Sequence, residues 1–231
     1  CRIIRQHRTH CAPTLPMGKP DLPGGTIMTP RIAALDSGTY YHHRTLYEPR
    51  YRGFFDGIIY TRDLGTIPLD DYDTLIVSCR TDPSVLIGHR DKFAAFLDSG
   101  RTLVVMGSTG PGEWLSDVEW HFTPTNFWWW KESGNLGLHV TAPDHPLFDH
   151  ITLADATWHH HGHLIVPDGA VSLIDVGDLG SILYDDTVSS KGRKIVTTLD
   201  PMYHHGSHFM PATTRFLDGF LPYLKGLAPA K

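Results

Sequence analysis

The sequence of 231 residues has no long hydrophobic run, few cysteines and no excess of basic charge. Its apolar runs are four to six residues long, whereas a membrane-spanning helix needs about 20 apolar residues, so we expect no membrane partner. The three cysteines (Cys1, Cys11 and Cys79) cannot form a disulfide framework, which favours a reducing, cytoplasmic setting. A formal net charge of −5 argues against nucleic acid as a partner, because proteins that bind it carry a basic face.

Residues 1–27 differ in composition from the rest of the chain. They contain four prolines and a Gly24-Gly25 pair, and they show no periodic apolar face. Met28 is a natural start, because the residues that follow it lead directly into the first predicted strand. We therefore expect residues 1–27 to be a disordered or non-native extension, or a mobile arm, and residues 28–231 to form a single domain.

Short apolar runs and helical patterns alternate after Met28. The run from Leu103 to Met106 is apolar on both faces, which is typical of a buried parallel strand. A helix is predicted from Asp82 to about Asp98, and an amphipathic helix begins at about Pro211. Strands are predicted over residues 32–35, 58–60, 74–78, 103–106, 171–174, 182–184 and 195–199. The alternation predicts an α/β fold in three layers, with a mostly parallel sheet and helices on both faces.

Polar residues follow four of the predicted strands. In such sheets ligands bind beyond the carboxyl ends of the strands, so we expect these segments to meet at one rim that binds a small polar molecule. The segments are Tyr40–Arg44, Cys79–Asp82, Gly107–Gly112 and Asp200–His208. The candidate catalytic residues are His42, His43, Asp200, His204 and His205. The candidate substrate-binding residues are Arg44, Arg80, Asp82, Ser108 and Thr109.

Histidines are the next signal, since more than half of the 16 histidines lie in three clusters around His42, His161 and His205. On a strand, His159, His161 and His163 would share one face. A further ligand for zinc or iron could then come from Asp200, His204, His205 or His208. The candidate metal ligands are therefore His159, His161, His163 and His208. Imidazoles also cap loops and stack on aromatic rings, so a rim without metal, where they act as acid or base or hold an anion, stays open.

Three segments resemble class I glutamine amidotransferase-like domains, including their trehalose-utilisation-type relatives. The run from Phe96 to Gly107 resembles the strand that leads to the nucleophile elbow. His145-Pro146-Leu147 resembles a His-Pro segment of the second half, and the run from Gly192 to Pro201 resembles the late strand that delivers the catalytic His and Glu. The resemblance covers about residues 31–226 and implies a flavodoxin-like fold.

The catalytic residues of that family are missing at the matching positions. Gly107, or Ser108 in a register shifted by one, stands where the family has its nucleophilic Cys. Asp200-Pro201-Met202 stands where the family has His-Pro-Glu. A thiol nucleophile needs a thiolate and a positioned base, so we expect a divergent protein without amidotransferase activity.

Three kinds of function remain open at this point. The first is an enzyme that uses the rim without the Cys-His-Glu triad, in one variant as a metal-assisted hydrolase. The second is a non-catalytic module for ligand binding or assembly, in which Trp128–Trp130 is the contact of a homo-oligomer. The third is an enzyme with Cys79 or Ser108 as nucleophile, since Arg80 would lower the pKa of the neighbouring thiol.

Overall fold

The computed structural model describes residues 29–124, 127–128, 131, 134–207 and 210–228. Its strands are β1 (Ile32–Asp36), β2 (Gly57–Tyr60), β3 (Thr74–Val77), β4 (Thr102–Val105), β5 (Glu119–His121), β6 (Leu138–Val140), β7 (His163–Ile165), β8 (Val171–Val176), β9 (Gly180–Asp186) and β10 (Arg193–Thr197). Its helices are α1 (Tyr40–Tyr47), α2 (Pro49–Arg52), α3 (Pro83–Ile87), α4 (Arg90–Asp98), α6 (Pro201–Gly206) and α7 (Pro211–Gly226).

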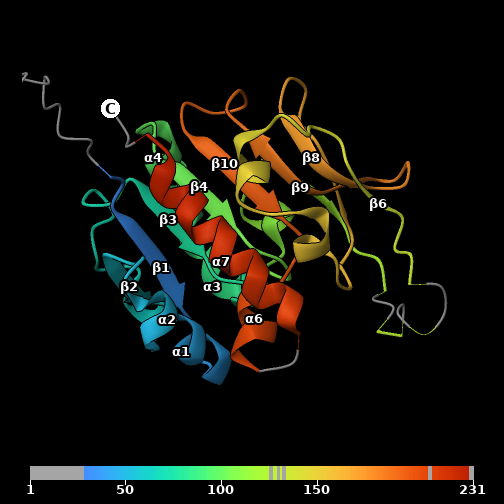
Figure 1. Cartoon of the computed structure of the whole chain (residues 1–231). Coiled ribbons are helices and arrows are strands. Elements are labelled where there is room, and N and C mark those ends of the chain that lie inside the picture. The colour runs from blue at the N-terminus through green and yellow to red at the C-terminus, as the bar shows by residue number, and fades with distance from the viewer. Residues whose placement is uncertain (1–28, 125–126, 129–130, 132–133, 208–209, 229–231) are drawn as a thin grey trace, which may run out of the picture.

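All of these strands belong to one sheet (Figure 1). The path runs β2-β1-β3-β4-β10-β9-β7-β5, while β8 pairs with β9 and β6 pairs with β8. The pairs from β2 to β10 along this path are parallel, and the pairs beyond β10 are antiparallel. The parallel half brings the carboxyl ends of β1, β3, β4 and β10 to one edge, where the polar segments follow.

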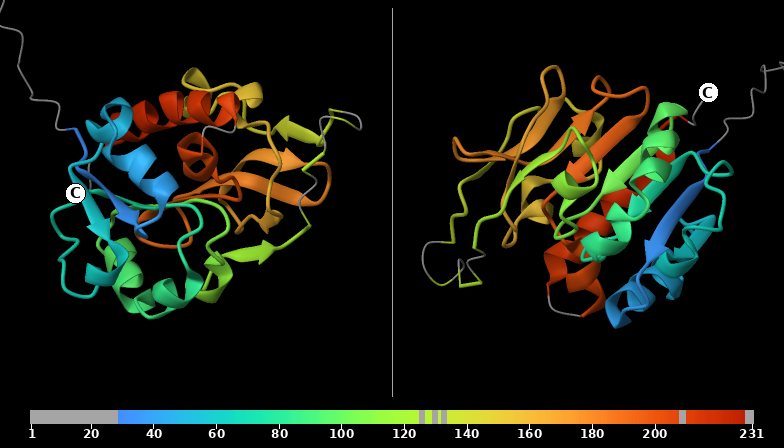
Figure 2. Two further views of the ribbon diagram at one scale, coloured as in Figure 1. Left: turned by 90° about the horizontal axis from the view of Figure 1, so that it is seen from below. Right: turned by 180° about the vertical axis from the view of Figure 1, so that it is seen from behind.

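Alternation along the central strands produces two cores, one on each face of the sheet. Ala34 packs into the core under α7, while its neighbours Ala33 and Leu35 pack into the opposite core with Phe93 of α4. Helices α1, α2, α6 and α7 cover one face, and α3 and α4 cover the other (Figure 2). This confirms the predicted three-layer α/β fold. Among the helices of the described ranges, none has the length and apolar composition needed to cross a membrane.

The helix predicted from Asp82 to Asp98 is two helices, α3 and α4. Gly88 and His89 separate them, and His89 takes a non-helical conformation with φ −123° and ψ 15°. Gly88 favours this break because glycine has a low helix propensity. Gly100 follows α4 with a φ of +85°, a left-handed conformation that glycine commonly adopts after the end of a helix.

The strand predicted over His159, His161 and His163 is wrong for the first two residues, because β7 begins only at His163. Gly162 has a φ of +120°, and a Cβ on it would stand 2.2 Å from the carbonyl oxygen of His121. The chain therefore bends at Gly162, and His159 and His161 lie in the segment before the strand rather than on one face of it.

Candidate metal centre

Asp200 lies at the carboxyl end of β10, where the chain turns into α6. Pro201 occupies the first turn of that helix, a position that suits proline because its missing N–H would have no partner there. Gly107, just after β4, lies so close to β10 that a Cβ on it would stand 2.1 Å from the carbonyl oxygen of Thr198. The ends of β4 and β10 thus lie together, and Asp200 is completely buried.

Both carboxylate oxygens of Asp200 accept hydrogen bonds. Arg80 donates to Oδ2 from Nε at 3.1 Å and from Nη2 at 2.9 Å, and His161 Nε2 lies 3.0 Å from the same oxygen. Trp158 donates from Nε1 to Oδ1 at 3.2 Å, and His204 Nε2 lies 3.3 Å from Oδ1. The loop after β3, the segment before β7 and helix α6 therefore converge on one buried carboxylate.

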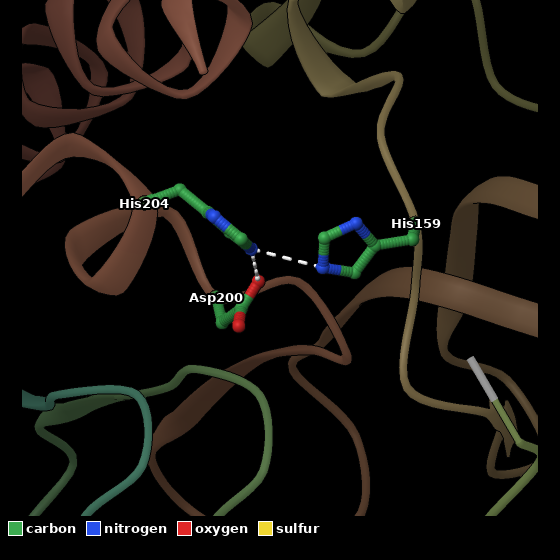
Figure 3. A group of neighbouring side chains, drawn as sticks. All are labelled: His159, Asp200 and His204. Carbon is green, nitrogen blue, oxygen red and sulfur yellow. Dashed lines mark hydrogen bonds and ion pairs between the residues drawn. The ribbon is translucent and has the colours of Figure 1, made fainter. Parts of the chain in front are cut away.

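His159 adds a third ligand atom next to Asp200 and His204 (Figure 3). Its Nε2 lies 2.9 Å from Nε2 of His204. One oxygen of Asp200 and one nitrogen of each imidazole all lie within 4.8 Å of one another, and the three residues are buried. This group could hold a metal ion, because two imidazoles and one carboxylate are a common ligand set for catalytic zinc and for non-haem iron(II).

The electrostatics keep these ligands in the forms that bind metal. Burial lowers the pKa of His159 to about 4, even though Asp200 opposes the shift, so this imidazole is neutral at pH 7. Burial alone would raise the pKa of Asp200, but hydrogen bonds from His161 and His204 outweigh it and hold that pKa well below its usual range. Metal ligation requires neutral imidazole and ionised carboxylate, and His159 and Asp200 meet these conditions.

Arg80 is fixed on three sides. Its guanidinium lies 3.6 Å from the centroid of the Tyr203 ring, and its backbone N–H donates to the carbonyl oxygen of Gly107 at 3.0 Å. In the described ranges, Arg80 and Ser108 are the two non-glycine residues with positive φ, at 62° and 60°. They follow the adjacent parallel strands β3 and β4. Backbone strain of this kind costs about 1–3 kcal/mol and concentrates at functional sites. It therefore supports the carboxyl-end edge of the sheet as the location of a functional site.

Several predicted residues meet at this centre. They are Arg80, His159, His161, Asp200 and His204. Of the four segments expected to meet at one rim, Cys79–Asp82 and Asp200–His208 do so through Arg80, Asp200 and His204. The side chain of Arg80 remains 30% exposed, whereas Asp200 and the three histidines are buried.

The segment after β1 does not contribute to the centre, because it is the helix α1 and successive side chains point about 100° apart. His42 is buried and bonded within the helix layer: its Nδ1 accepts from the backbone N–H of Ser37 at 3.1 Å, and its Nε2 lies 2.8 Å from the carbonyl oxygen of Cys79. His43 is exposed and stacks on Tyr47. Arg44 pairs with Glu48, four residues further on.

Other predicted binding residues have local structural contacts. Asp82 caps α3 by accepting from the backbone N–H of Ser84 at 2.9 Å. The hydroxyl of Thr109 donates to the carbonyl oxygen of Met106 at 3.1 Å. Ser108 has the strained backbone described above, and within the described ranges its side chain makes no hydrogen bond to the Asp200 centre. These contacts stabilise the turns after β3 and β4.

Two further predicted ligands lie away from the centre. His205 Nδ1 lies 2.8 Å from the hydroxyl oxygen of Thr214 on α7. His163 stacks on His121 of the neighbouring strand, with ring centroids 5.1 Å apart. His208, Trp129 and Trp130 lie outside the described residues.

Neither nucleophile position of the sequence analysis has an activated thiol. Burial raises the pKa of the Cys79 thiol, and the charge of Asp200 adds to this shift. Arg80 lowers this pKa as expected, but its effect is smaller, so the thiol is not activated. At Gly107, the contact with Thr198 leaves no space for a cysteine side chain.

Three aromatic residues at the centre were not predicted as site residues from the sequence. Trp158 bonds to Asp200, Tyr203 stacks on Arg80, and Phe127 packs edge-on against His159 with centroids 4.9 Å apart. Trp158 could have been found, because a buried indole N–H needs an acceptor and this residue directly precedes the histidine cluster. Phe127 and Tyr203 carry no comparable signal.

No known protein family matches the sequence, and no curated protein matches it. Solved structures do match the fold. A cytoplasmic protein from Salmonella typhimurium LT2 aligns with a TM-score of 0.54 at 12% identity, over 84% of this chain and 99% of that one. A glutamine amidotransferase from Thermotoga maritima aligns with a TM-score of 0.51 at 10% identity, over 84% of each chain. The chain therefore has the flavodoxin-type fold of class I glutamine amidotransferase-like proteins.

Proposed function

We propose that this protein is a metal-dependent hydrolase that binds a divalent ion, zinc or iron, at His159, Asp200 and His204 and acts on a small polar molecule. The observation that carries the proposal is the contact between the two imidazoles, whose Nε2 atoms lie 2.9 Å apart beside one carboxylate oxygen. A tetrahedral metal bound to two imidazole nitrogens places them about 3.3 Å apart, so a small side-chain movement admits an ion.

The surroundings of Asp200 support a ligand role. Metal-binding carboxylates are themselves held by hydrogen bonds from an outer shell, which fixes their orientation. Here Arg80 and His161 hold Oδ2, and Trp158 holds Oδ1 on the side of His204. A metal in such a site supplies a nucleophilic hydroxide at neutral pH and polarises the bond under attack.

The lack of the family's triad supports a chemistry different from glutamine hydrolysis. Gly107 leaves no space for a thiol nucleophile, Asp200 replaces the base, and Met202 is fully buried at the remaining position. The chain therefore keeps the fold and reuses the carboxyl end of β10 for a metal ligand.

Bound transition metal, measured by elemental mass spectrometry on protein purified without chelator, tests the proposal. We expect close to one equivalent of zinc or iron, and its loss in the double variant His159→Ala/His204→Ala. The matched control is His121→Ala/His163→Ala, which removes a histidine pair outside the centre. Metal content well below one equivalent after reconstitution, or equal loss in the control, would contradict the proposal. Metal-loaded protein that cleaves no ester, amide, lactone or phosphate ester would leave a binding module instead of a hydrolase.

A second function, assembly through the aromatic segment, has one supporting observation. Phe127 and Trp128 are 57% and 58% exposed, and neighbouring exposed aromatic side chains are typical of contact surfaces. Sedimentation velocity tests it: wild-type protein should form a dimer or larger oligomer that dissociates in Trp128→Ser and persists in the control Val188→Ser. A monomer at all concentrations would refute this role.

A further inference from the structure

A groove opens between α2, α6 and α7 beside the candidate metal centre. Its volume is about 390 Å³, and its lining includes Arg50, His204, His205, Thr214, Arg215 and Asp218. Pockets for small molecules are commonly about 300–1,000 Å³, so the groove is large enough for a metabolite-sized ligand. His204 belongs both to this lining and to the candidate metal centre, so the groove and the centre are adjacent.

Each of the two arginines of the groove is held by a carboxylate and keeps N–H donors available for a ligand. Arg215 donates from Nε to Asp155 at 2.7 Å, and its two terminal nitrogens have no hydrogen-bond partner in the part of the chain that the structure describes. Arg50 donates to Asp218 from Nε at 3.0 Å and from Nη2 at 2.6 Å. A guanidinium oriented by a carboxylate on one edge presents its other edge to an oxyanion without further loss of side-chain freedom.

Hydrogen-bond donors favour an anion in this groove. Each of its two guanidinium groups is paired with one carboxylate, Arg50 with Asp218 and Arg215 with Asp155. The attraction for an anion therefore comes from the N–H donors that these pairs leave available, since a guanidinium matches the geometry of a carboxylate or a phosphate. A divalent ion at the neighbouring centre would add to the attraction, because Arg80 already offsets the charge of Asp200.

We infer that this groove binds the anionic group of the substrate, a phosphate or a carboxylate, and so directs its reacting bond toward the centre at His204. The inference rests on the proposed function and specifies its substrate class as small organic anions. Arg215 provides the bidentate contact, and Arg50 provides the second positive charge.

Titration of the metal-free full-length chain, followed by ¹H–¹⁵N NMR, tests the inference. Inorganic phosphate and acetate are the two probes, each added at constant ionic strength. We expect the amide signals of His205 and Thr214 to shift with saturation, and Arg215→Gln to weaken the apparent affinity at least tenfold. The matched control is Arg62→Gln, an exposed arginine beside β2, which should leave the affinity unchanged.

A saturating response to phosphate supports a phosphorylated substrate, and one to acetate supports a carboxylate. The inference is overturned if neither probe shifts the groove signals, or if Arg215→Gln and Arg62→Gln respond alike. Because no metal is present, a failure of metal binding at His159 and His204 does not affect this outcome. The two proposals can therefore fail separately.

Discussion

The two ends of β10 both bury charged groups, but the groups differ in composition. At the amino end, the ammonium of Lys194 contacts Asp117, Asp186 and the hydroxyl of Ser189. An ammonium has three N–H donors, so each finds an oxygen acceptor. At the carboxyl end, the single carboxylate of Asp200 is surrounded by nitrogen atoms, and two imidazole Nε2 atoms lie 2.9 Å apart.

The difference shows which kind of buried polar cluster indicates a site. The three N–H donors of Lys194 are matched by two carboxylates and one hydroxyl, so this group forms a complete structural hydrogen-bond and ion-pair cluster. The Asp200 group instead places two imidazoles beside one carboxylate, a set of ligand atoms that could hold a metal ion. Burial and charge alone therefore do not separate the two ends; the balance of ligand atoms does.

The largest expected effect is one that both ends share. Removing one partner of a buried charge pair destabilises a protein by about 3–5 kcal/mol. We expect Asp200→Asn and Lys194→Met each to lower the free energy of unfolding by this amount in urea titrations, because Asp200 and Lys194 are both fully buried. A loss below about 1 kcal/mol in either variant would show that the corresponding group behaves like an exposed ion pair.

Metal addition should separate the two ends. A ligand at 100 times its dissociation constant stabilises the folded state by about 2.7 kcal/mol, which for a chain of this size corresponds to roughly 5–10 °C in Tm. We expect zinc to give such a shift in wild-type protein and in Lys194→Met, and no shift in His159→Ala. Thermal unfolding with zinc and then with chelator measures it. Equal shifts in all three proteins would place the ion elsewhere.

A third expectation concerns His42, predicted as catalytic and found bonded inside the helix layer. Burial lowers its pKa below 6.5, although its hydrogen bond to Cys79 and the nearby Asp36 oppose the shift. Below pH 6.5 the unfolded chain then binds a proton that the folded chain excludes, so stability falls as pH decreases. One such group contributes at most about 1.4 kcal/mol per pH unit.

The measurement is the unfolding free energy between pH 7 and pH 5 for wild type, His42→Gln and the control His43→Gln. His42→Gln should be less stable at pH 7 and should show a shallower decline with decreasing pH. His43 is exposed on the same helix, so its variant should follow the wild-type slope. Parallel slopes for all three proteins would mean that His42 titrates alike in the folded and unfolded states.

The strands of the fold could be predicted because apolar runs such as Leu103–Met106 have few alternatives to a buried parallel strand. The centre could be predicted in part, since Arg80, Asp200 and His204 follow strands whose ends must meet. The choice among adjacent histidines could not. For His159 and His161 it depends on Gly162, whose positive φ interrupts the extended chain before β7. For His42 and His43 it depends on α1, because the helix directs their side chains to different surroundings. Both are local backbone events set by tertiary contacts.

The smallest expected effect belongs to Arg44, predicted as substrate-binding and found paired with Glu48 on the surface of α1. Exposed pairs at i,i+4 on a helix contribute about 0.3–0.5 kcal/mol, and salt screens them. Arg44→Ala should therefore cost no more than this in low salt and nothing measurable in 1 M NaCl, and it should leave the zinc shift in Tm intact. The same substitution at Arg80 removes a half-buried partner that orients Asp200 and should reduce that shift, because loss of such a partner weakens metal binding about 10- to 100-fold. If Arg44→Ala reduced it equally, the metal centre would extend to α1, and the boundary drawn between the Asp200 centre and the helix layer would have to move.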